Sequence, residues 1–183
     1  MIDAHQFEAF VREYQDMVFA TAVRLLGNAA EAEDVAQTVF LRAFQRFEAI
    51  AASPSAAGWL KVVTRNACLN HVSRYRARWR FFSELDPRDS GDAHASYETE
   101  LPSSHSLDAD MEQAELRERL EQALRALPDH QRVPIVLFHF EQLSYQEISE
   151  LLGVSLGKLK TDMHRGRQAL RPLLTLPSSD ASR

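Results

Sequence analysis

Hydrophobic residues recur at three- and four-residue intervals through the first fifty positions. Residues 5–27 carry one apolar stripe and end at Gly27, a common helix stop, so they predict a helix. A second helix begins after Asn28, which forms an approximate capping box with Glu31, and it runs to about Ile50. The two predicted stripes are Phe7, Phe10, Val11, Tyr14, Val18, Ala22 and Leu25, then Val35, Val39, Ala43 and Phe47.

A loop and a third helix follow. The segment 51–58, AASPSAAG, is rich in the Ser, Pro and Gly residues that favour loops. The third helix is predicted over 58–80, beginning near Trp59. No alternating run long enough for a sheet occurs anywhere, so the sequence predicts an all-α protein.

Helical spacing returns in the last third of the chain, beginning at Asp108 or Asp110. Pro128 suits the first turn of the next helix, and Pro134 is expected to kink that helix or delay its start. The apolar residues expected to be buried are Met111, Leu116, Leu120, Ala123, Leu124 and Leu127, then Ile135, Val136, Phe138 and Phe140.

The stretch 143–171 has the pattern of a helix-turn-helix. Ser144 and Glu147 form a capping box that opens a helix over 145–152, and Gly153 ends it. Ser155 then caps a last helix, Leu156–Leu170, which is the candidate reader helix for a DNA groove. Its expected buried stripe is Leu156, Leu159, Met163 and Leu170.

The charge of the chain is unevenly distributed. The formal net charge is −5, but residues 83–112 hold nine acids and one base, which gives −8 and leaves +3 for the rest. Such a polar, acidic segment predicts a flexible linker. We therefore expect a helical domain at 1–82, an acidic linker at 83–110, a second helical domain at 111–174 and a tail at 175–183.

Two basic surfaces are candidates for binding nucleic acid. On the reader helix, an arginine paired with guanine would supply about 1–3 kcal/mol of discrimination. In the third helix, aromatic side chains alternate with basic residues such as Arg65. These aromatic rings could stack on unpaired nucleotide bases. The alternative to nucleic-acid binding is a basic helix face that is simply solvated. For Trp59 the alternative is a role in closing the helical bundle, and its position in the sequence favours that role. The candidates are Lys158, Lys160, Thr161, His164, Arg165 and Arg167, and Trp59, Lys61, Arg65, Arg74, Arg76 and Arg78.

The second helix offers a candidate protein-binding face. It has more phenylalanine than one buried stripe needs, which indicates either an exposed apolar surface or a thick core. Its outer positions are Asp34, Gln37, Thr38 and Leu41, beside Phe40 and Phe44.

Several classes of protein are disfavoured. The seven histidines do not fall at metal-ligand spacing, and the single cysteine, Cys68, lies among apolar residues. Neither a glycine-rich phosphate loop nor a nucleophile paired with a base occurs, so we expect no metal, no cofactor and no enzymatic activity. Without a signal-peptide pattern or a long apolar run, a cytoplasmic location is expected.

Together these stretches resemble the extracytoplasmic-function (ECF) group of bacterial sigma factors, the promoter-recognition subunits of RNA polymerase. The matching segments cover nearly the whole chain apart from the linker and the last dozen residues. They are AEDVAQTVF (32–40), GWLKVVTRNACLNHVSRYRAR (58–78), ALPDHQRV (126–133) and LSYQEISELLGVSLGKLKTDMHRGRQAL (143–170).

The resemblance implies a role for each half. The first would be a sigma-2-like domain, with Asp34, Gln37 and Phe40 on the clamp helices of the polymerase β′ subunit and Leu41 beside them. Its loop 50–58, with Asn66, would capture a flipped base of the −10 element. The second would be a sigma-4-like domain that reads the −35 element and contacts the β flap. Family members are commonly restrained by an anti-sigma factor.

Departures from the family pattern lie in the reader helix and the clamp motif. Lys158 stands where a Thr is usual, Asp162 where an Arg is usual, and Thr38 where a Glu is frequent. Asp162 could weaken DNA affinity, accept a hydrogen bond from a cytosine amino group, or pair with Arg165 or Lys158.

The linker length bears on how the chain could act. A flexible coil of thirty residues averages about 30 Å, whereas elements 25 base pairs apart are separated by about 85 Å of DNA. The two halves should therefore need the polymerase to be spaced correctly. The rival readings are a stand-alone helix-turn-helix regulator and a protein-binding helical adaptor.

Overall fold

The computed structural model describes residues 4–51, 53–83 and 107–175; over 73–83, 107–114 and 173–175 it describes the backbone alone. Every regular element within these ranges is a helix, which confirms the all-α prediction. The helices are α1 Ala4–Leu26, α2 Ala29–Gln45, α3 Phe47–Ala51, α4 Ala56–Ser83, α5 Leu107–Ala126, α6 Asp129–His139, α7 Tyr145–Leu152 and α8 Leu156–Thr175.

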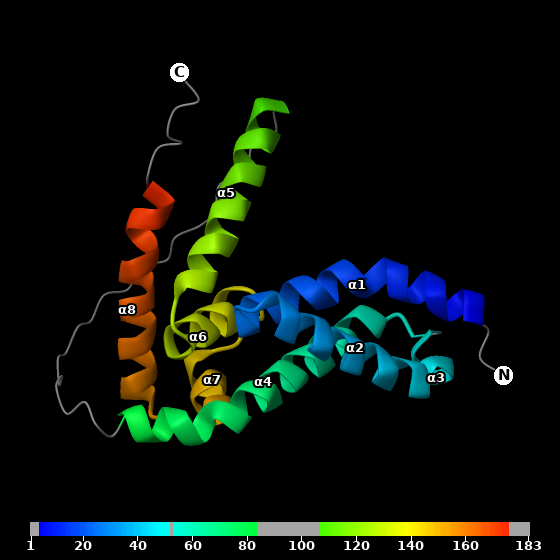
Figure 1. Ribbon diagram of the computed structural model, residues 1–183, viewed down its shortest axis with the longest axis horizontal. Coiled ribbons are helices and arrows are strands. Elements are labelled where there is room, and N and C mark those ends of the chain that lie inside the picture. The colour runs from blue at the N-terminus through cyan, green and yellow to red at the C-terminus, as the bar shows by residue number, and fades with distance from the viewer. Residues whose placement is uncertain (1–3, 52, 84–106, 176–183) are drawn as a thin grey trace.

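The first half is a bundle in which α1, α2 and α4 pack on one another (Figure 1). Both predicted stripes supply its core; Val18, Ala22, Val39 and Ala43 are fully buried. The expected single helix to Ile50 is wrong in one respect. The backbone leaves the helical region at Arg46, so α2 ends at Gln45 and the short α3 follows.

In the second half, α8 packs on α5, α6 and α7. Gly166 permits this packing, because a Cβ atom at this position would lie 2.5 Å from Cδ1 of Ile135 on α6. Pro134 does not delay the start of α6, which begins at Asp129 and contains Pro134 as a buried residue. Pro128 is the N-cap of α6, one position before the first turn in which it was expected.

Two expected core residues of the second half are exposed. Leu116 on α5 and Leu156, the first residue of α8, are each 44% exposed. Each precedes the part of its helix that packs in the core: among the described side chains, the buried residues of α5 start at Ala123, and those of α8 start at Leu159.

The two halves are in contact. The C-terminal end of α1 packs against α6 and α5, so the upright pair α5 and α8 stands beside one end of the first bundle (Figure 1). Most of the predicted linker lies outside the described residues, although α5 begins at Leu107, within the range 83–110. The proposed domain boundaries therefore remain predictions.

Candidate nucleic-acid and protein interfaces

The turn that precedes the reader helix is built as the sequence predicts. The hydroxyl of Ser144 accepts a hydrogen bond from the backbone N–H of Glu147, and the Glu147 carboxylate accepts from the backbone N–H of Ser144 at 2.8 Å. The Ser144 hydroxyl also donates to the Glu147 carboxylate at 2.7 Å, and this bond, followed by the one from the Ser144 backbone, lowers the pKa of Glu147. Gly153 ends α7 in the left-handed conformation at φ 64°. The capped helix and glycine turn fix the direction in which α8 leaves.

Replacing Ser144 by alanine should lower the free energy of unfolding by about 1 kcal/mol, the usual cost of losing such a cap. Because the folded-state pKa of Glu147 is lowered, its contribution is present above the ordinary glutamate pKa and is lost as pH falls through the lowered value. Urea denaturation at pH 7 and pH 3 should show that the difference in unfolding free energy between the wild type and Ser144→Ala is smaller at pH 3. Glu150→Gln, on the same helix but outside the capping box, should leave stability nearly unchanged.

The reader helix α8 has two distinct faces. Leu159, Met163 and Leu170 are buried, as predicted. Lys160, His164 and Arg165 are exposed on the other side. Thr161 is half-buried, and its hydroxyl donates to the backbone oxygen of Gly157 at 3.0 Å. The exposed groups thus form a basic face, as a helix needs in order to approach a DNA groove.

Asp162 belongs to the inner face of α8. It is 6% exposed, and its carboxylate accepts an ion-paired hydrogen bond from the ammonium of Lys158 at 3.0 Å. Half-buried His130 of α6 lies close by; burial lowers the pKa of His130, and the charge of Asp162 opposes the lowering. Of the alternatives that the sequence left open, the structure shows the pairing with Lys158. Lys158 is therefore held toward the helix rather than extended.

The side chain of Arg167 contacts two other helices of the second half. Its guanidinium donates to the hydroxyl of Tyr145 at 3.2 Å and lies 5.7 Å from the ring centre of Phe138. These contacts join α8 to α7 and α6, so Arg167 has a structural role in addition to the DNA contact predicted for it.

On α4, the structure places only part of the second basic surface. Lys61 and Asn66 are exposed, whereas Arg65 is half-buried and its Nε has no hydrogen-bond partner among the described residues. Trp59 is half-buried against the core, as the bundle-closing alternative requires. The side chains of the remaining candidates, Arg74, Arg76 and Arg78, lie outside the described residues.

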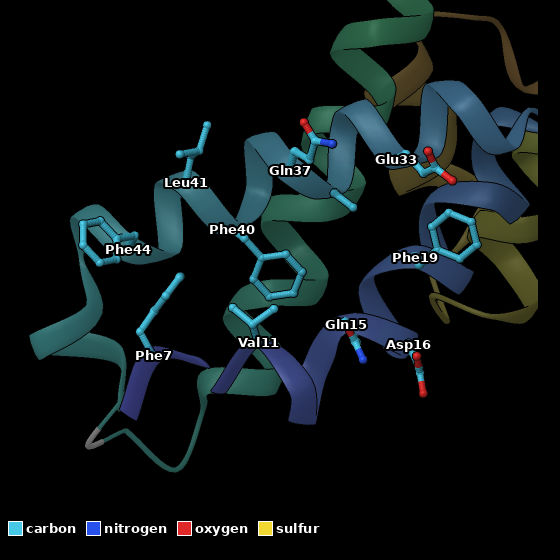
Figure 2. Close-up of a pocket in the computed structure, with 11 residues that line it drawn as sticks. Phe7, Val11, Gln15, Asp16, Phe19, Glu33, Gln37, Phe40, Leu41 and Phe44 are labelled. Atoms are coloured by element: carbon cyan, nitrogen blue, oxygen red, sulfur yellow. The ribbon is translucent and has the colours of Figure 1, made fainter. Parts of the chain in front are cut away.

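An open apolar groove runs between α1 and α2 (Figure 2). Gln37, Phe40 and Leu41 line it from α2; the ring of Phe40 points toward Val11, and Leu41 projects outward. Leu41 is 65% exposed, the largest value among the exposed large hydrophobic residues that the structure describes. Asp34 is exposed on the same helix but does not line the groove.

The contribution of α1 to this groove was not anticipated. The sequence assigned the apolar residues of α1 to the core, yet Phe7 and Phe19 also line the groove. The ring of Phe7 packs edge-on against Phe44, with ring centres 4.9 Å apart. Phe19, which lies outside the predicted stripe, is the one signal in the sequence for a second apolar face on α1. The other groove residues from α1 are Val11, Gln15 and Asp16.

Among the residues that the structure describes, Cys68 and the potential metal ligands do not form a site. Cys68 is fully buried, and burial followed by the nearby charge of Glu141 raises the pKa of its thiol to about 12. Cys68 thus packs as a small apolar side chain within the core, in keeping with its apolar neighbours in the sequence. Within 4–51, 53–83 and 107–175, no cluster of His, Cys, Asp and Glu could hold a metal ion. None of the described helices combines the length and the hydropathy that a membrane span requires.

Comparison with known proteins identifies the family. The family model described as Sigma-70 region 2 matches residues 10–80, and that described as Sigma-70, region 4 matches residues 117–170. The ECF RNA polymerase sigma factor SigW of Bacillus subtilis is 31% identical, over 94% of this chain and 90% of its own length. The ECF RNA polymerase sigma factor SigE of Mycolicibacterium smegmatis is 36% identical over 96% of this chain and 64% of its own length.

One solved structure is also similar to this chain. In the complex of the sigma factor RpoE with the anti-sigma factor NepR from Bartonella quintana, the match covers 93% of this chain and 97% of that chain, with 23% identity and a TM-score of 0.47. The sequence relatives, in contrast, are similar over nearly the whole length, and both family models match in order. The chain belongs to the ECF RNA polymerase sigma factors.

Proposed function

We propose that this chain is an alternative sigma factor that binds core RNA polymerase and directs it to promoters. The observation that carries the proposal is the presence, in one chain, of a capped helix-turn-helix with a basic outer face and a separate exposed apolar groove. A DNA reader alone has no need of the groove, and an adaptor alone has no need of the basic helix. In this role the protein acts in the cytoplasm without a cofactor, catalyses no reaction itself, and is restrained by an anti-sigma factor.

The groove between α1 and α2 is proposed as the site for the β′ clamp helices. Phe19, Leu41 and Phe44 together expose apolar surface along one side of the bundle. Such contiguous patches mark protein-binding sites. Gln37 at the groove and Asp34 beyond its edge would add polar contacts that fix the register of the bound helices.

Helix α8 is proposed to read the −35 element, and the basic part of α4 the −10 element. On α8, Arg165 and Lys160 are exposed and can reach base edges or phosphates. On α4, Lys61 and Asn66 are exposed in the same way. Arg65 completes this set only if its guanidinium moves out of its half-buried position.

Asp162→Asn should increase the dependence of DNA binding on salt. The substitution removes the carboxylate that holds Lys158, so the ammonium becomes free to contact a phosphate. One additional phosphate contact steepens the slope of log K against log[salt] by about 0.9. Fluorescence anisotropy with a −35 duplex, between 50 and 200 mM salt, measures the slope. Asp162→Asn combined with Lys158→Met should return it to the wild-type value; an unchanged slope in Asp162→Asn would show that Lys158 is already in use.

Run-off transcription tests the main proposal. Core RNA polymerase should give discrete transcripts from promoter DNA of the source organism only when this chain is added, and the chain alone should bind the same DNA weakly in a gel shift. Tight, specific binding by the chain alone, with no effect on core polymerase, would instead identify a stand-alone regulator. If Arg165→Ala changed neither transcription nor DNA binding, the adaptor reading would be favoured.

A further inference from the structure

We infer that the two halves of the free chain dock on each other through a specific polar surface, and that this closed state competes with promoter recognition. The inference rests on the proposed function, because closure matters only if the two halves must read separated DNA elements. The occupant of the surface is the other half of the same chain. The docking surface consists of the C-terminal end of α1, the start of α6 and the facing side of α5.

Arg132 of α6 lies at the centre of the surface. It is 3% exposed, and its guanidinium donates to the backbone oxygen of Leu26 at 2.7 Å, at the end of α1. It also donates to the oxygen of Leu127 at 2.8 Å and pairs with Asp129 in its own half. The last carbonyls of a helix have no partner within the helix. A residue of the second half therefore caps a helix of the first.

Gly27 makes this approach possible. It lies directly after α1 at φ +71°, a conformation that favours glycine. A Cβ atom there would lie 2.6 Å from Cζ and Nη1 of Arg132. The same glycine therefore ends α1 and leaves room for the guanidinium.

Arg24 provides a second contact between the halves. Its Nε donates to the carboxylate of Glu121 on α5 at 2.5 Å, and both side chains are less than a third exposed. The Arg24 guanidinium also lies 4.5 Å from the ring centre of Phe140, just after α6. A charge pair and a cation–π contact on one side chain give the docking a defined register.

Helix α4 also faces the second half. After the hydrogen bonds of Ser144, the charge of Arg65 adds to the lowering of the pKa of Glu147 at the start of α7. Arg65 is thus near an acid of the second half while its Nε is buried without a partner. A residue proposed to contact the −10 element therefore lies near the second half in this state.

In the closed arrangement, the two proposed DNA-binding helices lie too close together to reach both promoter elements. Helix α8 packs on α6, α6 on α1, and α1 on α4. Packed helices lie about 8–10 Å apart, so three such steps place the two proposed DNA-binding helices within about 30 Å of each other. Elements 25 base pairs apart are separated by about 85 Å. The docking surface must therefore separate before both elements are read together.

The test measures the distance between the halves in the full-length chain. Spin labels are placed at Ala49→Cys and Gln168→Cys, on exposed positions of α3 and α8, in a Cys68→Ala background. We expect one narrow distance distribution for this parent and a broad one for Arg24→Glu. Adding Glu121→Arg to Arg24→Glu restores an ion pair of opposite direction and should narrow the distribution again.

Arg12→Glu is the matched control. It makes the same charge change on α1 but breaks only the exposed pair with Glu8 within that helix, so the narrow distribution should persist. A broad distribution in the parent, or no change in Arg24→Glu, would overturn the closed state.

Binding to core polymerase tests whether closure restrains the protein. The apparent affinity of a protein falls in proportion to the fraction of molecules in the binding-competent state. Arg24→Glu, which favours the open state, should therefore bind core polymerase several-fold more tightly. The charge-swapped double variant should return to the wild-type affinity. Equal changes in both variants would indicate a direct contact of Arg24 with polymerase and would overturn the restraint. If no variant bound core, the proposed function would fail, while the distance measurement would still decide the closed state.

Discussion

Leu41→Asp should reduce the affinity for core RNA polymerase by more than thirtyfold and abolish run-off transcription. Leu41 is the most exposed of the large hydrophobic residues that line the groove. An apolar anchor at the centre of a protein interface commonly contributes 2 kcal/mol or more, about a thirtyfold change in affinity. A carboxylate at this position would in addition have to be desolvated on binding.

The folding of the Leu41→Asp variant is expected to be unaffected, because most of the Leu41 side chain is exposed and contributes little to the buried core. Val62→Asp is the matched control: Val62 is 44% exposed, but it lies on α4 outside the groove. Core binding measured without DNA should separate the two variants, and thermal melts should show that both remain folded. Equal loss of affinity in both would contradict the assignment of the groove as the binding site.

The helices were predictable because local signals agree with one another. The capping box at Ser144 and the glycine at Gly153 specify α7 to the residue, since each satisfies backbone groups at one end of the helix. Periodicity likewise identified Val18 and Val39 as core residues. The break at Arg46 was missed, because nothing in the local pattern distinguishes a brief departure from helical backbone within a continuous apolar stripe.

The interfaces were less predictable, because they depend on which elements meet. The outward position of Gln37 and Leu41 follows from helical spacing, but the role of Phe19 requires knowing that α1 lies beside α2. The pairing of Asp162 with Lys158 was one of several alternatives, and burial decided among them. The contacts of Arg132 with α1 join residues more than a hundred positions apart, which no local pattern encodes.

Arg132→Met should lower the free energy of unfolding by about 3 kcal/mol, because it leaves the carbonyls of Leu26 and Leu127 buried with reduced hydrogen bonding, at about 1–3 kcal/mol for each. The Asp129 carboxylate, which is partly exposed, can be rehydrated and adds less. Arg125→Met, on the exposed side of α5, is the control and should cost well under 1 kcal/mol. Urea denaturation followed by far-ultraviolet circular dichroism measures both.

Combining Arg132→Met with Gly27→Ala tests whether the two residues share one contact. Gly27→Ala alone suffers both the left-handed backbone, about 1–2 kcal/mol for a residue with a Cβ atom, and the steric overlap with the Arg132 guanidinium. In the Arg132→Met background the guanidinium is absent, so only the backbone cost remains. The double variant should therefore be more stable than the sum of the single effects predicts, by an interaction energy of about 1 kcal/mol or more. Strict additivity would mean that α1 and Arg132 are not in contact in solution, and the capping of α1 by the second half would have to be abandoned.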